Sequence, residues 1–430
     1  MTIVKPPLKI LAFDSWTGGA HHLEPIAEEL LSLNCEILLL HVGSWGHDID
    51  RPKEEQRGAL NIRDISYYEG LSLDKILDRE SPNIVVFLST RAFIHQAFNR
   101  YARFRGIPTL HMAHGLIYVQ DVELDHGVNN VNHWKRLVLI RSRLIKNLTR
   151  LLPGYALALL RTRASLSDWR AFATEIIYKI SLKSSLIAPP DCTTTAGLVY
   201  VSADIPFLRD GYNVPANSIG IIGNPDLVRF GLKDESIGMC LNRTDEKTEK
   251  NVLYLDTALD IEGFVFPDTA AVLKHWIELK KALSHQGFSL LLKLHPARND
   301  PELEKLITES GITLVGNNDF LSVLENVEAA ISEPSTAGVV PALMGVPLFL
   351  PRFGLLNSQR YGPILTTYPL SQFLDNPANL GALTKKIKEN VDIVAFETWS
   401  EDYIGKRPIA NVAKRAAQAF VNLAKHKAIE

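Results

Sequence analysis

Two short segments in the second half of the chain combine residue types that could bind a phosphorylated ligand. His295 and Pro296 follow an apolar run that begins at Ser289. A second apolar run ends in the sequence SEPSTAG, in which Ser335 and Thr336 open an expected helix. In an open parallel α/β sheet, ligands lie at the carboxyl ends of strands and the amino ends of helices. We therefore predict a pocket for a phosphorylated donor at these two loops.

The first half of the chain places histidines in a comparable position. The sequence GGAHHLEP follows an apolar run and contains Gly18, Gly19, His21 and His22. Glycines let the backbone pass close to a ligand, and histidine titrates near working pH. His114 lies at the end of another apolar run. These three histidines are therefore candidates for proton transfer.

The elements that must position these residues alternate between strand and helix patterns. Apolar runs such as 8–13, 36–42 and 252–255 are separated by helical spacing such as 93–105 and 270–283. This alternation predicts an α/β protein of two Rossmann-like, doubly wound domains. We expect an N-terminal domain over 1–232, a polar linker over 233–250 and a C-terminal donor domain over 251–430.

Composition restricts the class of protein further. The 430 residues have a formal net charge of −2 and 46% hydrophobic residues, so sizeable cores can be buried and no polyanionic partner is indicated. Only three cysteines are present, far apart, which indicates a reducing compartment and neither a disulfide framework nor a zinc site. We expect no secretory signal, and no apolar stretch is long enough to span a bilayer. We expect a cytoplasmic protein, soluble or peripheral to a membrane.

One segment departs from this balanced charge. Residues 126–167 contain no Asp or Glu but carry eight cations among apolar residues such as Trp134. The cations are Lys135, Arg136, Arg141, Arg143, Lys146, Arg150, Arg161 and Arg163. The pattern is typical of a helix in a membrane interface, and we predict a helical insertion over about 116–190 that binds an anionic inner leaflet. A helix packed on its own domain with a solvated basic face is the alternative, and nucleic acid is disfavoured because no reader motif is present.

The order of these motifs resembles that of the GT-B glycosyltransferases and the related nucleotide-sugar 2-epimerases. GGAHHLEP looks like the glycine-rich turn of the peptidoglycan N-acetylglucosaminyl transferases, and the IIGNP sequence at 221–225 resembles the end of their first domain. The His-Pro step and the Ser335–Thr336 pair look more like the sialyl, Kdo and glycerophosphate transferases, which act on cytidine nucleotides. Ala113-His114-Gly115 is similar to a His-Gly step in several of these enzymes.

This resemblance implies roles for individual residues. The donor would be a nucleotide sugar, CMP- or UDP-linked, bound by His295, Glu333, Ser335, Thr336, Gly338 and Gln359, with Glu333 accepting from the ribose hydroxyls. The acceptor base would be His21, His22 or His114, with the first two preferred and Asp14 the next candidate. A helix cap at Ser335 and a turn at His295 are the ordinary structural alternatives. No Asp-x-Asp lies at a strand end, so neither a metal nor a cofactor is expected.

The expected activity is therefore metal-independent transfer of a sugar to a lipid-linked or oligosaccharide acceptor in bacterial surface-polysaccharide synthesis, such as lipopolysaccharide or capsule. The expected location is the inner face of the plasma membrane. Two alternatives remain open: a nucleotide-sugar 2-epimerase, and a catalytically inactive GT-B scaffold at a membrane.

Overall fold

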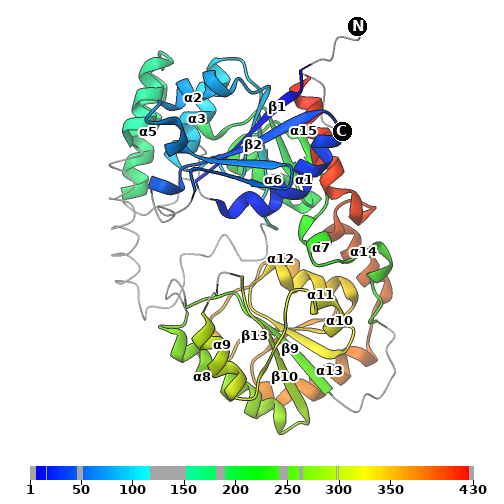
Figure 1. Ribbon diagram of the computed structural model, residues 1–430. Helices are drawn as coiled ribbons and strands as arrows, with labels where there is room; N and C mark the ends of the chain where they lie inside the picture. The colour runs from blue at the N-terminus through cyan, green and yellow to red at the C-terminus, as the bar shows by residue number, and fades with distance from the viewer. Residues whose placement is uncertain are drawn as a thin grey trace. The chain divides into compact units, whose positions relative to one another are not determined.

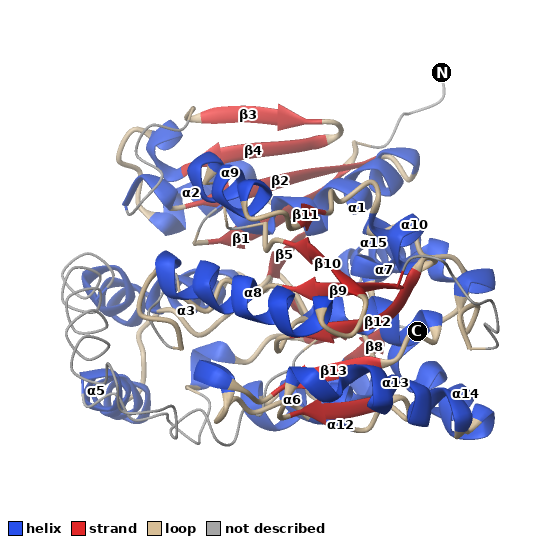
Figure 2. Ribbon diagram, turned by 90° about the horizontal axis from the view of Figure 1, so that it is seen from below, coloured by secondary structure: helices blue, strands red, loops and turns tan. Residues whose placement is uncertain are grey.

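The computed structural model describes residues 6–15, 17–45, 52–116, 152–180, 189–241, 250–260, 265–296, 298 and 300–425. These residues form two compact units. The first contains the described residues up to Gly115, those of 152–225, and the chain from Asn411 onward. The second contains the described residues from Asp226 to Ala410. Each is an α/β unit with helices beside a sheet, as the sequence predicts (Figures 1 and 2).

The first unit contains an eight-stranded sheet in the order β3-β4-β2-β1-β5-β6-β7-β8. Its strands are β1 (Leu8–Asp14), β2 (Cys35–His41), β3 (Glu54–Arg57), β4 (Leu60–Asp64), β5 (Ile84–Phe87), β6 (Thr109–Met112), β7 (Ala196–Val199) and β8 (Ile219–Ile221). All neighbours pair in parallel except β3 with β4. The residues of β5 and β6 are all buried, as expected where helices cover both faces of a parallel sheet.

Helices of the first unit pack through apolar faces. They are α1 (Ala20–Ser32), α2 (Leu73–Glu80), α3 (Phe93–Phe104), α5 (Leu166–Ile180), α6 (Ile205–Tyr212) and α15 (Val412–Ala424), and residues 152–161 are also helical. Helices α2 and α3 share one core with β1, β2 and β5. The last described helix, α15, packs against α1 and β1 and so returns to this unit (Figure 1).

The second unit contains a six-stranded parallel sheet in the order β11-β10-β9-β12-β13-β14. Its strands are β9 (Lys250–Leu255), β10 (Phe288–Lys293), β11 (Thr313–Leu314), β12 (Val327–Ser332), β13 (Leu348–Pro351) and β14 (Ser371–Leu374). Counted along the chain this order is 3-2-1-4-5-6, the doubly wound order of dinucleotide-binding folds. The register places Lys293 and Ser332 level with Leu255, so three strands end together.

Helices of the second unit are α7 (Pro225–Arg229), α8 (Thr269–Ser284), α9 (Pro301–Glu309), α10 (Phe320–Leu324), α11 (Val339–Met344), α12 (Pro363–Thr366), α13 (Leu380–Glu389) and α14 (Ile393–Ile404). Side chains of α8, α9 and α13 fill the core beside β9 and β10, with Trp276 fully buried at its centre. Residues 234–241, inside the expected linker, are bonded to this unit: the N–H groups of Gly238 and Cys240 donate to the carbonyls of Leu343 and Met344.

Helices are present between β6 and β7, where the sequence predicts a helical insertion. Residues 152–161 and α5 form its described part, and 117–151 and 181–188 lie outside the described residues. Of the eight cations noted above, only Arg161 and Arg163 are therefore described. No described helix is long and apolar enough to cross a membrane.

Candidate functional site

In each unit, the carboxyl edge of the sheet carries polar side chains where the strand order reverses. This reversal lies between β1 and β5 in the first unit and between β9 and β12 in the second. At such a point the connections leave in opposite directions and open a crevice, which is where ligands bind in doubly wound sheets. The first strand at each reversal ends in an aspartate, Asp14 at the end of β1 and Asp256 directly after β9.

Asp14 is the centre of the polar group in the first unit. It is 5% exposed, and burial raises the pKa of its carboxyl to about 6 against the lowering effects of the Ser15 N–H and the charge of His114. Nε2 of His95, a buried residue of α3, lies 3.8 Å from Asp14 Oδ1. The sequence signal for Asp14 was its place at a strand end, whereas nothing in the helical pattern of 93–105 distinguished His95.

His114 extends from the end of β6 toward this group. Its Nδ1–H donates to the carbonyl of Leu88 at 2.8 Å, just beyond β5. This bond fixes the tautomer, so Nε2 carries the lone pair that a general base requires. Because the ring is also exposed, it can reach a substrate hydroxyl.

The two histidines of the glycine-rich turn differ in environment. His21 is exposed, and its Nδ1–H donates to the carbonyl of Gly18 at 2.6 Å, which leaves Nε2 as a proton acceptor. His22 is buried, with its Nδ1 3.3 Å from the hydroxyl of Tyr200. The two ring centroids are 3.9 Å apart, and the ring planes are tilted by 40°. His21 therefore has the geometry of a base, whereas His22 supports it from inside the unit.

Gly19 has a packing role. A Cβ at this position would lie 2.2 Å from Leu88 Cδ1 and 2.8 Å from Asp14 Oδ2. Its φ of −75° is open to any residue, so the glycine is required by close contact and not by backbone conformation. The start of α1 thereby sits directly against Asp14.

In the second unit, Asp256 holds the loop that carries His295. Its Oδ2 accepts from the backbone N–H of His295 at 3.1 Å. Both Asp256 oxygens also accept from Arg298, whose guanidinium is bonded to Asp260 as well. Arg298 is 9% exposed and stacks over Trp276 at 5.4 Å. The loop that carries His295 is thus fixed to the end of β9 by a buried ion-pair cluster.

Glu333 lies directly after β12 and is fully buried. Its Oε1 accepts from the hydroxyl of Tyr254 at 2.7 Å, and its Oε2 accepts from the N–H and hydroxyl of Thr257 at 2.8 and 2.5 Å. Burial, together with the negative charge of Asp256, raises the pKa of Glu333 to about 7. Both oxygens are engaged inside the protein, so a direct ribose contact stays a prediction and would require these bonds to rearrange.

The hydroxyl-rich loop begins the next turn of the chain. Ser335 Oγ accepts from the N–H of Ala337 at 3.2 Å, which is the cap arrangement named above as the structural alternative. Thr336 is half-buried at the same turn, and Gly338 packs so tightly on Ser332 that a Cβ would lie 2.5 Å from Ser332 Oγ. This loop therefore lies at the same edge of the sheet as His295 and Glu333.

Gln359 is placed apart from that group. Its side chain donates to the carbonyl of Arg360 at 3.1 Å in the loop after β13. Among the described residues it is not bonded to His295, Glu333 or Ser335. No group of three or more possible metal ligands occurs in the described part of the chain.

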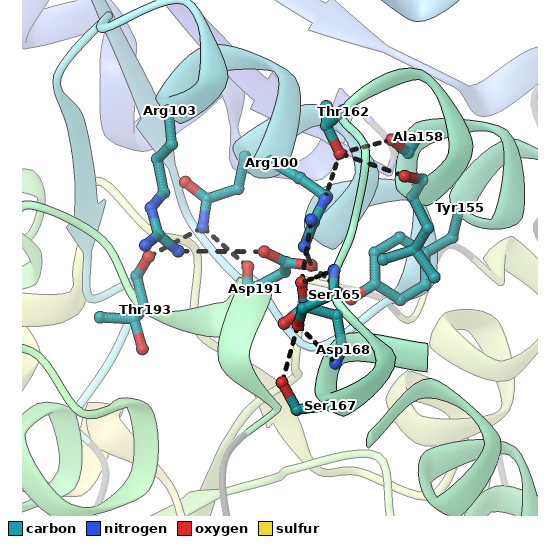
Figure 3. A network of polar contacts seen from close by, with 12 residues as sticks. Arg100, Arg103, Tyr155, Ala158, Thr162, Ser165, Ser167, Asp168, Asp191 and Thr193 are labelled. Carbon is teal, nitrogen blue, oxygen red and sulfur yellow. Dashed lines mark hydrogen bonds and ion pairs between the residues drawn. The ribbon is translucent and has the colours of Figure 1, made fainter. Parts of the chain in front are cut away.

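The described helices of the insertion are anchored to the first unit by buried charges. Asp191 accepts from Arg100 Nη1 at 2.9 Å and from the Tyr155 hydroxyl at 2.6 Å, and Arg100 also donates to Asp168 at 3.1 Å (Figure 3). The carboxylate of Glu175 on α5 turns inward and accepts from Gln96 at 2.7 Å. Asp168 and Glu175, the two acidic residues of 152–180, are therefore both bonded to α3.

The outer face of the same helices is apolar and basic. Leu157, Leu160, Leu166 and Ile177 are 37%, 64%, 78% and 66% exposed. Arg163, in the turn before α5, and Arg170, on α5, are also exposed. Arg161, in contrast, pairs with Asp74. Residues 152–180 are thus packed on their own domain, yet present a face without carboxylates.

Comparisons with known proteins find solved structures with a similar fold but no protein with a similar sequence. No family description matches the chain, and no curated protein matches it. The wall teichoic acid polymerase TagF is similar with a TM-score of 0.50 and 13% identity, over 98% of this chain and 90% of that one. MnaA of S. aureus with UDP gives 0.49 and 12%, over 98% of both chains. The spinosyn forosaminyltransferase SpnP gives 0.47 and 13%, over 97% of this chain and 99% of that one.

The likeness to TagF, taken with the strand orders, defines the class of fold. The chain is an α/β protein with two Rossmann-like parallel-sheet domains, as in the GT-B fold.

Proposed function

We propose that the protein is a glycosyltransferase that moves a sugar from a nucleotide-activated donor to an acceptor hydroxyl. One observation carries the proposal: both Rossmann-like sheets have a carboxylate and a histidine at the point where strand order reverses. A transferase needs two such sites, one to deprotonate the acceptor and one to stabilise the departing nucleotide. The order of the sequence motifs and the fold likeness to TagF support the same function.

In the first unit we propose His114 as the acceptor base, with His21 as the alternative. Each ring donates its Nδ1–H to a backbone carbonyl and is exposed, so Nε2 can take a proton. The charge of Asp14 acts on His114 and would stabilise the imidazolium that forms. This arrangement favours His114 over His22, which is buried against Tyr200.

In the second unit we propose that His295, Ser335 and Thr336 bind the donor phosphate. The backbone N–H of His295 donates to Asp256, which holds the loop that carries the imidazole at the end of β9. Hydroxyl groups and turn N–H groups at 335–338 would add donors for the charge that develops on the leaving group. CMP- or UDP-linked sugars are the proposed donors.

We further propose a lipid-linked or oligosaccharide acceptor in bacterial surface-polysaccharide synthesis, such as lipopolysaccharide or capsule, at the cytoplasmic face of the membrane. The carboxylate-free face of 152–180 and the basic sequence of 126–151 support this location. Apolar residues would enter the interface while cations are attracted to anionic lipid. Such docking would bring the site to an acceptor that a freely diffusing enzyme rarely meets.

The purified protein incubated with a panel of CMP- and UDP-sugars tests the proposal. Slow donor hydrolysis, accelerated by a glycan acceptor, is the expected result. His295→Ala should lower turnover about 10²-fold, and replacement of the true base by alanine about 10²- to 10⁴-fold with donor affinity kept. His285→Ala, an exposed histidine at the end of α8, is the control and should be neutral.

Two other outcomes would contradict the proposal. Interconversion of the nucleotide sugar at C2, without release of nucleotide, would identify a 2-epimerase. No turnover of any donor, with liposome binding retained, would identify an inactive scaffold.

A further inference from the structure

Lys293 is a buried cation that no carboxylate of the described residues neutralises. It is the last residue of β10 and is 5% exposed. Its ammonium donates to the side-chain oxygen of Asn317 and lies 5.5 and 5.2 Å from the ring centres of Phe230 and Phe320. Among the described residues it forms no ion pair. The contacts of the ammonium are thus a neutral amide and two aromatic rings.

Such a position is costly in the absence of an anion. Moving an ammonium out of water costs several kcal/mol unless an opposite charge compensates. Lysine is for this reason almost never buried unless it is paired. Burial, with the positive charge of Arg229, also lowers the pKa of Lys293. If this position contributed only to hydrophobic packing, a buried methionine or leucine would stabilise the fold more than a lysine.

Two more basic side chains, Arg229 and His295, approach the same point. The Arg229 guanidinium lies 4.8 Å from the centre of the Phe230 ring, the same ring that Lys293 contacts. His295 follows Lys293 by two residues, and the charges of both Lys293 and Arg229 act on its imidazole. Arg229 pairs with Asp226 at 3.1 Å, and Asp256 is occupied by Arg298. The carboxylates nearby are therefore already used by other cations.

We propose that Lys293, together with Arg229 and His295, forms a binding site for a phosphate or diphosphate group. The site lies at the carboxyl end of β10, level with the end of β9 at the reversal of strand order. Lys293 supplies a desolvated charge, and Phe230 and Phe320 exclude water and so strengthen its attraction to an anion. That this anion is the phosphate of the nucleotide donor rests on the proposed function, whereas the anion site itself does not.

Calorimetric titration of pyrophosphate, phosphate, UDP, CMP and the two nucleosides into Lys293→Met tests the assignment. Methionine keeps the length of the side chain and removes its charge. The affinity for pyrophosphate and nucleotides should fall about 10- to 100-fold, the effect of losing one charged hydrogen bond, while the nucleosides are unaffected. The ligand-free melting temperature should stay the same or rise, because a buried charge has been removed. Lys305→Met, an exposed lysine of α9, is the matched control and should change neither quantity.

Unchanged pyrophosphate and nucleotide affinity in Lys293→Met would overturn the proposal. A lowered melting temperature with equal loss of nucleoside and nucleotide binding would also overturn it, because Lys293 would then be structural. Arg229→Gln, at a half-exposed position, is the second variant. It should lower the affinity for the same anions, and it tests the site if Lys293→Met does not fold. If pyrophosphate binding depends on Lys293 but the protein transfers no sugar, the anion site is supported and the proposed glycosyltransferase function is rejected. Transfer activity unaffected by Lys293→Met would keep the glycosyltransferase and reject this anion site as the place where the donor phosphate binds.

Discussion

Among single residues, each of the two sheet edges carries a buried carboxyl group with a raised pKa, Asp14 in the first unit and Glu333 in the second. Glu333 is the clearest example, since all its bonds are internal and Asp256 adds a negative charge nearby. A carboxyl whose pKa is higher in the folded than in the unfolded protein favours folding while it is protonated. Its contribution is complete below the ordinary value of 4.5 and is lost as pH rises to about 7.

We therefore predict a pH-dependent stability difference between the wild type and Glu333→Gln. As pH rises from 4.5 to 7.5, the melting temperature of the wild type should fall relative to that of the variant. The difference corresponds to roughly 2–3 kcal/mol, which is several degrees for a unit of this size. Thermal melts across this range measure it. Melting curves that run parallel at every pH would show that Glu333 is already ionised in the folded protein.

At the scale of elements, close contacts fix how helices meet the sheet edge. Gly19 lets the start of α1 pack on Leu88 and Asp14, and Gly338 does the same for the turn beside Ser332. Neither requires a left-handed backbone, so each is a contact between an element and its neighbour.

We predict that Gly19→Ala destabilises the protein by about 1–3 kcal/mol, because the new methyl group overlaps Leu88 and the Asp14 carboxylate. Gly115→Ala is the control: it lies at the same sheet edge, no atom lies within 4 Å of its added methyl group, and we expect a change within about 0.5 kcal/mol. Urea denaturation compares the two variants. Equal stability of both would mean that α1 shifts freely to accept a side chain.

At the scale of the whole molecule, the insertion between β6 and β7 combines an anchored inner face with an apolar and basic outer face. Asp191 and Glu175 turn inward, and exposed leucines lie outside. The remaining cations of the sequence pattern lie outside the described residues.

We predict that the protein sediments with anionic liposomes and that binding weakens as salt is added, since charges are screened over roughly 8 Å at physiological ionic strength. Changing Lys135, Arg136, Arg141 and Arg143 to glutamate should abolish sedimentation, at about 1 kcal/mol for each cation removed. The same change in net charge at Lys274, Lys281, Lys305 and Lys385, exposed lysines of the second unit, should leave it intact. Equal binding by both variants, or none by the wild type, would support a helix that only packs on its own domain.

Much of the fold could be predicted from the sequence, because strand and helix periodicities report local burial. The runs at 8–13, 252–255 and 289–294 became β1, β9 and β10 with small shifts at their ends. The hairpin of β3 and β4 and the edge strand β14 gave no such signal, because they are short and half exposed. Helix α14 was missed for a different reason, because its apolar residues are distributed around the helix and do not form one apolar face.

The two doubly wound domains, and the strand ends at which chemistry is expected, could be predicted from the residues along the chain. His295, Ser335 and His114 all lie at such ends, because hydrophobic runs stop where the chain leaves a sheet. Which of these side chains meet could be learned only from the folded protein. Asp256 reaches His295 across 39 positions of sequence, and Lys293 lies between aromatic rings from two other segments. The closed bonds of Glu333 and the return of α15 to the first unit have the same origin. These contacts depend on which strands become neighbours in the sheet, and the residue periodicity within one segment does not specify its neighbours.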